Sequence, residues 1–139
     1  MITLREINRD NFHNVIGLSV FEGQEVFVAS NIYSLAQAKA QPECMPLAIY
    51  NDDTLVGFVM YCMDYEDKEY WIYRLLIDRN HQKKGYGKFA MQQVIDRVKE
   101  DKAYSKLYVS FQIEPENTVA KTLYESLGFV PPRHLSRFF

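Results

Sequence analysis

Apolar and polar positions along the chain recur with two different periods, which predict strands and helices in a mixed order. Alternating apolar and polar residues predict strands, and apolar residues three and four positions apart predict helices. Together with helix propensity, this predicts strands at residues 2–7, 45–50, 54–64, 70–77 and 106–113, and helices at 11–18, 33–40, 88–102 and 117–127. Asp10 is expected to cap the first helix and Pro42 to end the second.

The order of these elements predicts the fold class. Asn51-Asp52-Asp53 has the composition of a tight turn, so the strands at 45–50, 54–64 and 70–77 are expected to form an antiparallel meander. The strand at 70–77, the loop, the helix and the strand at 106–113 then make a right-handed crossover. The prediction is an α/β (α+β) fold with a mixed, mostly antiparallel sheet flanked by helices, in a single domain over residues 1–139.

Composition narrows the classes of protein that the chain can represent. Its 139 residues are 47% hydrophobic and 24% charged, with a formal net charge of -2, which does not favour a nucleic-acid partner. The apolar run 55–63 is too short to cross a bilayer, and the charged N-terminus lacks a signal-peptide pattern, so a cytoplasmic location is expected. Cys44 and Cys62 lack metal-ligand spacing and are expected to be reduced and buried. No metal site is expected.

A glycine-containing loop between a strand and a helix is the clearest candidate for chemistry. Gln82-Lys83-Lys84-Gly85-Tyr86-Gly87 has two glycines in six residues, and the basic residues Arg79 and Lys88 flank it. Glycines permit a tight turn, and the first amides of the next helix can bind an anion. The loop matches neither the P-loop nor the Gly-x-Gly-x-x-Gly pattern. It is therefore either a diphosphate-binding loop or an ordinary strand-to-helix turn.

Residues on both sides of this loop extend its pattern. They are Leu75-Leu76-Ile77-Asp78 before it, Gln82-x-x-Gly85-x-Gly87 within it, and Asn117 and Tyr124-x-x-x-Gly128-Phe129 after it. This set resembles the GNAT superfamily of N-acetyltransferases over nearly the whole chain. Through Gln24-x-x-Phe27-Val28-Ala29-x-Asn31-x-x-Ser34-Leu35, the chain also resembles the bacterial diamine, spermidine and spermine acetyltransferases.

The resemblance implies that acetyl-CoA is the co-substrate and assigns residues to it. The pantetheine arm is expected along Leu75, Leu76 and Ile77, and the pyrophosphate on the amides of Gln82, Lys83, Lys84, Gly85, Tyr86, Gly87 and Lys88. Asn117 is expected either to contact the pantetheine chain or only to cap the last helix. Tyr124 is expected beside the sulfur, where a neutral phenol can protonate the leaving thiolate; the alternative is a core aromatic.

The resemblance also implies a primary amine as acceptor, here a polyamine or a diamine. Glu22 and Glu25 are expected to attract the cationic acceptor. Tyr73 stands where several polyamine acetyltransferases carry a carboxylate, and with Tyr33 and Trp71 it could flank the alkyl chain. Deprotonating a free alkylamine at pH 7 costs roughly 4.6 kcal/mol, so a base is needed. Glu22, Glu25 and a water relay remain candidates for that base.

Two further expectations concern the end of the chain and the alternative functions. A short strand is expected to begin at Phe129, and Pro131-Pro132 then interrupts pairing. Because a full GNAT fold usually has two strands there, the final strand is expected to be short, absent or supplied by the partner of a homodimer. The alternative acceptors are an aminoglycoside, an amino acid or a protein amine, and the rival function is a non-catalytic acyl-CoA-binding module.

Overall fold

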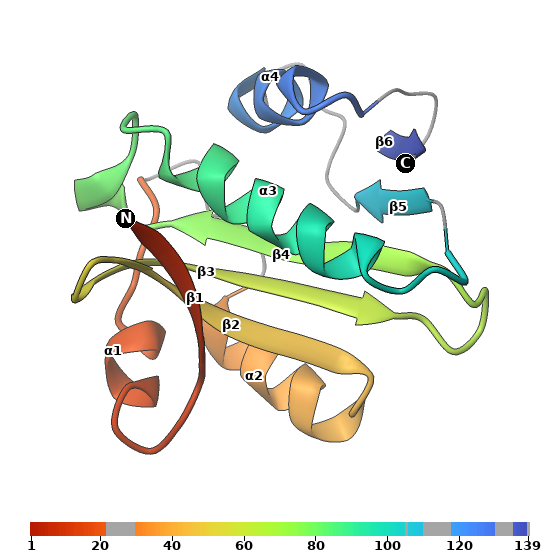
Figure 1. The fold of residues 1–139 in the computed structure, drawn as a ribbon. Helices are drawn as coiled ribbons and strands as arrows, with labels where there is room; N and C mark the ends of the chain where they lie inside the picture. Colours follow the sequence, from red (N-terminus) through yellow and green to blue (C-terminus); the bar gives the residue numbers. More distant parts are fainter. Residues whose placement is uncertain (22–29, 105, 110–117, 130–134, 139) are drawn as a thin grey trace.

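A single mixed sheet with helices on both faces forms the fold of the computed structural model, which describes residues 1–21, 30–104, 106–109, 118–129 and 135–138 (Figure 1). Its strand order is β1-β2-β3-β4-β5-β6. The strands are β1 (Ile2–Glu6), β2 (Cys44–Asn51), β3 (Thr54–Met63), β4 (Tyr70–Ile77), β5 (Lys106–Val109) and β6 (Leu135–Phe138). The helices are α1 (Phe12–Ile16), α2 (Asn31–Ala40), the short 3-10 helix η2 (Arg79–His81), α3 (Tyr86–Lys99) and α4 (Thr118–Ser126).

The strand pairing confirms the mixed, mostly antiparallel sheet. Strands β1 to β4 pair antiparallel in sequence order, β5 pairs parallel to β4, and β6 pairs antiparallel to β5. The parallel pair follows from the crossover through α3, because a helix returns the chain to the same end of the sheet. Strand β6 has four residues, so the strand that follows α4 in this chain is short.

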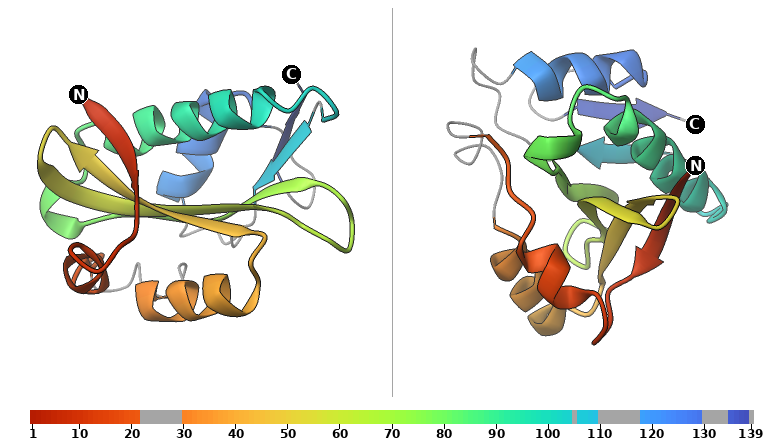
Figure 2. Two further views of the ribbon diagram at one scale, coloured as in Figure 1. Left: turned by 60° about the horizontal axis from the view of Figure 1, so that its bottom comes forward. Right: turned by 90° about the vertical axis from the view of Figure 1, so that its left-hand side faces the viewer.

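The two faces of the sheet bury separate cores. Helices α1 and α2 cover one face, and α3 lies across the other (Figures 1 and 2). The core on the α3 side includes Leu47, Val59, Ile72, Met91, Val94, Ile95, Leu107 and Tyr124. The core on the α1/α2 side comprises Val15, Cys44, Ala48, Phe58, Met60 and Cys62, with Tyr73 and Leu35 packed against it. Cys44 and Cys62 are free and buried, as expected.

Three expected boundaries are wrong. Asn11, not Asp10, is the N-cap of α1, and its side chain makes no capping bond because its Oδ1 accepts from the Asn8 amide at 2.9 Å instead. Helix α3 begins at Tyr86 rather than near Lys88, because the left-handed Gly85 at its N-cap already completes the turn. Phe129 lies outside a strand, and the described strand after α4 begins at Leu135, beyond the two prolines.

Between two consecutive pairs with β3, strand β4 contains one extra residue. Met60 pairs with Arg74 and Tyr61 pairs with Ile72, so Tyr73 is the extra residue of a β-bulge. A bulge can place two consecutive side chains on the same face of a sheet. Here Tyr73 packs with the α1/α2-side core, and the next residue, Arg74, bonds to Gln37 of α2. In the described residues, pairing of β4 with β5 covers only Tyr70–Ile72 and stops beside this bulge.

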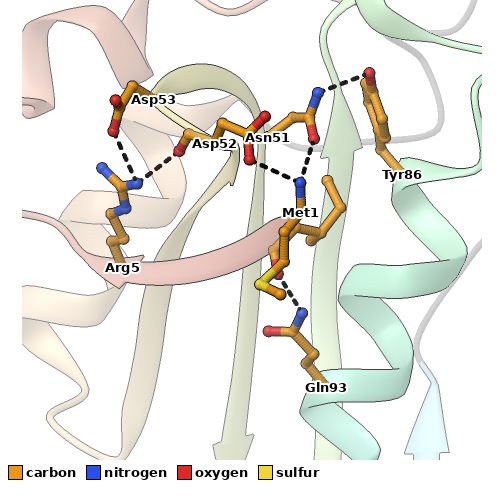
Figure 3. A network of polar contacts seen from close by, with 8 residues as sticks. Met1, Arg5, Asn51, Asp52, Asp53, Tyr86 and Gln93 are labelled. Carbon is orange, nitrogen blue, oxygen red and sulfur yellow. Dashed lines mark hydrogen bonds and ion pairs between the residues drawn. The ribbon is translucent and has the colours of Figure 1, made fainter.

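A polar network joins the start of α3 to the β2–β3 turn and to β1 (Figure 3). Asn51 Nδ2 donates to the Tyr86 hydroxyl at 3.1 Å, and the Met1 ammonium donates to Asn51 Oδ1 at 3.1 Å. Farther along α3, Gln93 Nε2 donates to the Ile2 carbonyl at 2.6 Å. These bonds fix α3, and with it the preceding glycine loop, against the edge of the sheet.

Candidate active site

The glycine loop forms an uncapped helix N-terminus. Gly85 is the N-cap residue of α3 with φ 82°, and Lys83 has φ 64°, so two residues of the turn adopt left-handed conformations. No side chain caps the helix. The first amides of an α-helix have no partner within the helix and point along its axis, where they can bind an anion. The local geometry is therefore that of the expected diphosphate-binding loop.

Charge favours an anion at this helix end. Lys83, Lys84 and Lys88 are exposed, and the first turn of α3 contains no acidic residue. The positive end of the helix dipole adds to this field. The loop consequently combines fixed backbone donors with mobile cationic side chains, a combination that suits a pyrophosphate better than a single carboxylate.

Two side chains of the loop have structural partners. Gln82 Nε2 donates to the carbonyl of Ile77 at 3.0 Å and so links the loop to the end of β4. The Tyr86 side chain points toward the β2–β3 turn and accepts the bond from Asn51 (Figure 3). These two contacts hold the loop in shape, which leaves its backbone as the expected contribution of Gln82 and Tyr86 to anion binding.

The three β4 residues expected along the pantetheine arm lie on different faces. An added Cβ at Gly87 would lie 3.6 Å from Ile77 Cγ1, 3.8 Å from Leu75 Cδ2 and 3.6 Å from Leu123 Cδ2, so these side chains converge beside the loop. Leu76 pairs with Phe58, whose side chain is in the core on the α1/α2 side, and cross-strand partners share a face. Leu76 is thus brought to the opposite face from Leu75 and Ile77.

Tyr124 of α4 is buried in the core on the α3 side. Its side chain is 5% exposed, and its ring packs edge-on against Phe129 with centroids 5.9 Å apart. Burial raises the pKa of Tyr124 above the ordinary tyrosine value. The hydroxyl is therefore protonated at pH 7, the state that a general acid requires, and the preceding residue, Leu123, lies beside Gly87.

On the α1/α2 side of the bulge, the Tyr73 hydroxyl has a carboxylate partner. Its hydroxyl donates to Asp64 Oδ2 at 2.7 Å, so the turn after β3 brings a carboxylate to this strand. The bond from Tyr73, followed by turn amides, lowers the pKa of Asp64. Burial, and then hydrogen bonds with Cys62 and Asp64, raise the pKa of Tyr73. At neutral pH the pair is thus a neutral phenol bonded to an ionised carboxylate.

The other two aromatic residues expected near the acceptor also have partners. The Trp71 indole stacks on Tyr108 with centroids 4.8 Å apart, and its Nε1 donates to Asp67 Oδ2 at 2.8 Å. Tyr33 of α2 is 59% exposed, and the Arg74 guanidinium lies 5.7 Å from its ring centroid. Tyr33 and Tyr73 consequently both neighbour Arg74.

The segment after α1 is fixed to the end of β4. Asp78 follows β4 directly and accepts a bond from the Ser19 amide at 2.9 Å, and the Arg79 amide donates to the Ser19 carbonyl at 2.6 Å. The Arg79 guanidinium lies 6.0 Å from the Phe21 ring centroid. This contact brings the chain preceding Glu22 next to the glycine loop. Glu22, Glu25 and Asn117 themselves lie outside the described residues.

Sequence reasoning missed Arg74, Asp64 and the bulge. One signal could have drawn attention to this point: Arg74 is the only charged residue in the otherwise apolar run 70–77. The bond from Tyr73 to Asp64 has no such signal, because it depends on how two strands pair. Within the part of the chain that is described, no group of three potential metal ligands gathers, and no helix is both long and apolar enough to span a membrane.

Comparison with known proteins identifies the family. The acetyltransferase (GNAT) family model matches residues 3–129, and the chain belongs to this family. The spermine/spermidine N(1)-acetyltransferase of Bacillus subtilis (strain 168) is 29% identical over 134 residues, with 92% of this chain and 87% of that protein covered. The chain is thus similar to that protein over most of both sequences.

Solved structures with the same fold differ in their acceptors. The spermidine N-acetyltransferase of Vibrio cholerae in complex with CoA and spermine has a TM-score of 0.77 at 17% identity, covering 99% of this chain and 95% of that one. An aminoglycoside acetyltransferase in complex with coenzyme A has a TM-score of 0.79 at 13% identity, with the same coverage. These likenesses show the fold. With the family match, they make this protein an acetyl-CoA-dependent N-acetyltransferase.

Proposed function

We propose that the protein acetylates a primary amine of a polyamine or diamine such as spermidine or spermine. The observation that carries this proposal is the similarity to the Bacillus subtilis spermine/spermidine N(1)-acetyltransferase across 92% of the chain. The Vibrio cholerae enzyme, whose structure is a complex with CoA and spermine, adds support from the fold alone. Residues 1–139 act as one acetyltransferase domain in this proposal.

Acetyl-CoA is proposed to lie along β4, with its pyrophosphate on the amides of residues 82–88. From Ile77 to Tyr73 is four residue steps, or roughly 13 Å at about 3.3 Å each, so the strand can accompany an extended pantetheine arm from the loop to the bulge. Leu75 and Ile77 would contact that arm with their side chains. Leu76 would contribute its backbone, and Asn117 would bond to the arm.

The reaction joins the two substrates directly. The neutral amine nitrogen attacks the thioester carbon, the carbon–sulfur bond breaks, and Tyr124 gives its hydroxyl proton to the departing sulfur. Support for this role comes from the protonated state that burial imposes on Tyr124. Positioning of both substrates supplies much of the rate, since it replaces a bimolecular encounter by an oriented one.

The acceptor is proposed to enter from the α1/α2 side. Glu22 and Glu25 would attract its ammonium groups, and Tyr73 would contact its alkyl chain. The hydrogen bond from the Ser19 amide to Asp78 supports this placement, because it holds the chain that precedes Glu22 beside the glycine loop. We further propose that the enzyme acts in the cytoplasm, where polyamines and acetyl-CoA occur together, and that it assembles as a homodimer.

A thiol-release assay tests the function. Acetyl-CoA is supplied with spermidine, spermine, putrescine, an aminoglycoside, an amino acid or a lysine peptide, and free CoA is measured for each. Release with the three polyamines, at a higher kcat/KM than with the other amines, is expected. Preference for the aminoglycoside would replace the polyamine proposal. Coenzyme binding without release for any amine would favour the non-catalytic acyl-CoA-binding module.

A further inference from the structure

Arg74 is the only charged residue of β4, and it lies at the bulge. It pairs with Met60, whose side chain belongs to the core on the α1/α2 side, so the guanidinium is on the face where the acceptor is proposed to enter. Its neighbour Tyr73 is the residue proposed to contact that acceptor. Neither composition nor the glycine loop explains why a cation occupies this position.

The partners of Arg74 are all neutral. Its Nη1 donates to the Tyr73 carbonyl at 3.0 Å, and its Nη2 donates to Gln37 Oε1 at 2.9 Å. The Tyr33 ring lies 5.7 Å away, and Nε is buried without a hydrogen-bond partner. The ion pairs of the described residues involve the N-terminus, Arg5 and Lys121, and none includes Arg74. Among the described residues, this partly buried positive charge therefore has no carboxylate within ion-pair distance.

The surrounding titratable groups do not cancel this charge. Around it lie Tyr33 of α2, Cys44 of β2 with the adjacent Glu43, Cys62 and Asp64 at the end of β3, and Tyr73 of β4. Burial raises the pKa of both thiols, so they are neutral at pH 7. Asp64 is ionised, but it accepts its hydrogen bond from Tyr73 rather than from Arg74.

A fixed cation beside an amine favours the neutral form of that amine. A like charge close to a titratable nitrogen disfavours its protonated state, and each pKa unit changes the neutral fraction about tenfold. Acetyl transfer requires the neutral form, because the nitrogen lone pair makes the new bond to carbon. The proposed function leaves the general base unassigned, so a group that makes deprotonation easier would supply what the site lacks.

We infer that Arg74 lowers the pKa of the acceptor amine bound at the β4 bulge and thereby takes over part of the work of a general base. This inference rests on the proposed function. The released proton passes to solvent, and the guanidinium keeps its own protons throughout. For a polyamine, Arg74 disfavours charge on the nitrogen that reacts.

The pH dependence of the chemical step tests the inference. The single-turnover rate of spermidine acetylation is measured between pH 6 and 10 for the wild type and for Arg74→Gln and Arg74→Met, two neutral variants that guard against a folding defect in one of them. The midpoint of the lower limb should rise by about one pH unit. At pH 7 the rate should fall roughly tenfold, and above the midpoint it should return to the wild-type value.

Two further variants separate charge from packing. Arg74→Lys keeps the charge and should keep the wild-type midpoint. Gln37→Leu removes the bond to α2 but leaves the guanidinium, so its midpoint should also stay unchanged. Melting temperature and coenzyme affinity show whether each variant is folded.

An unchanged midpoint in both neutral variants would overturn the inference. The inference would also be overturned if Gln37→Leu raised the midpoint as much as the neutral Arg74 variants do. Arg74 would then act only by linking β4 to α2. If the wild type released no CoA with any of the amines tested, the proposed function would be rejected, and the inference would be rejected with it.

Discussion

The two faces of β4 carry different kinds of groups at the proposed substrate sites. On the α3 face, Ile72, Leu75 and Ile77 pack into the core, and the anion-binding geometry at the end of the strand comes from backbone amides around Gly85. On the α1/α2 face, Tyr73 and Arg74 present polar side chains to α2 and to the turn after β3. One strand thus joins a site made of backbone to a site made of side chains.

This difference has a consequence for specificity. Backbone donors depend on the course of the chain and tolerate many sequences, whereas a side-chain site changes with each substitution. The solved structures agree with this contrast, since a spermidine and an aminoglycoside acetyltransferase share the fold at 17% and 13% identity. We therefore expect the choice of acceptor to depend on side chains of the α1/α2 face. The following substitutions test this division of the molecule.

Replacing the proposed proton donor should have the largest effect. For Tyr124→Phe, kcat should fall about a hundredfold or more, because general acid catalysis typically contributes that much. Coenzyme affinity should be kept, since the ring remains. Tyr70→Phe is the matched control: its hydroxyl donates to Asp101 at the opposite end of β4. Equal turnover in Tyr124→Phe and in the wild type would remove Tyr124 from the mechanism.

Disturbing the glycine loop should weaken coenzyme binding alone. Alanine in the left-handed conformation of Gly85 costs about 1–2 kcal/mol, so Gly85→Ala should raise the Kd for CoA roughly tenfold by distorting the turn. Isothermal titration calorimetry measures this change. Gly17→Ala is the control, because Gly17 has φ -76° and an added Cβ would make only ordinary contacts. A raised acceptor KM with unchanged CoA affinity would contradict the division between the faces.

Removing the acidic residues before α2 should affect the acceptor side only. Glu22→Gln combined with Glu25→Gln should raise the KM for spermidine about fivefold, since exposed charge interactions contribute up to about 1 kcal/mol. Steady-state kinetics at fixed, saturating acetyl-CoA measures it. Glu6→Gln with Glu100→Gln removes the same charge from exposed positions elsewhere. If both double variants raise the KM for spermidine equally, Glu22 and Glu25 act only through the net charge of the protein.

The smallest effect concerns stability at alkaline pH. Burial raises the pKa of Cys62 on the α1/α2 face to about 12, above its value in the unfolded chain. Its neutral thiol therefore contributes stability below about pH 9, and this contribution is lost as pH rises toward 12. In urea unfolding, Cys62→Ala should lose less stability than the wild type between pH 9 and pH 11. Val59→Ala is a buried control without a titratable group. If the free energy of unfolding fell equally with pH in all three proteins, Cys62 would not be the group responsible.

Much of the coenzyme side could be predicted from the sequence. Strand β4 has the predicted bounds, and the glycine loop follows it, because both depend on residues close together along the chain. The start of α3 was wrong by two residues, since a left-handed Gly85 lets the helix begin within the loop. The strand expected to begin at Phe129 does not include that residue, and the described strand after α4 lies beyond the two prolines, because a short edge strand has little pattern of its own.

The acceptor side depended on contacts that no local pattern specifies. The sequence by itself determined the sheet strands, the turn chemistry and the anion-binding loop, all of which follow from spacing within a few residues. Only the tertiary structure decided that Tyr73 is the extra residue of a bulge, that its hydroxyl bonds to Asp64, and that the Arg74 guanidinium bonds to Gln37 of α2. The physical reason is register: a shift of one residue between two strands turns a side chain to the other face, and that shift is set by the packing of the whole sheet.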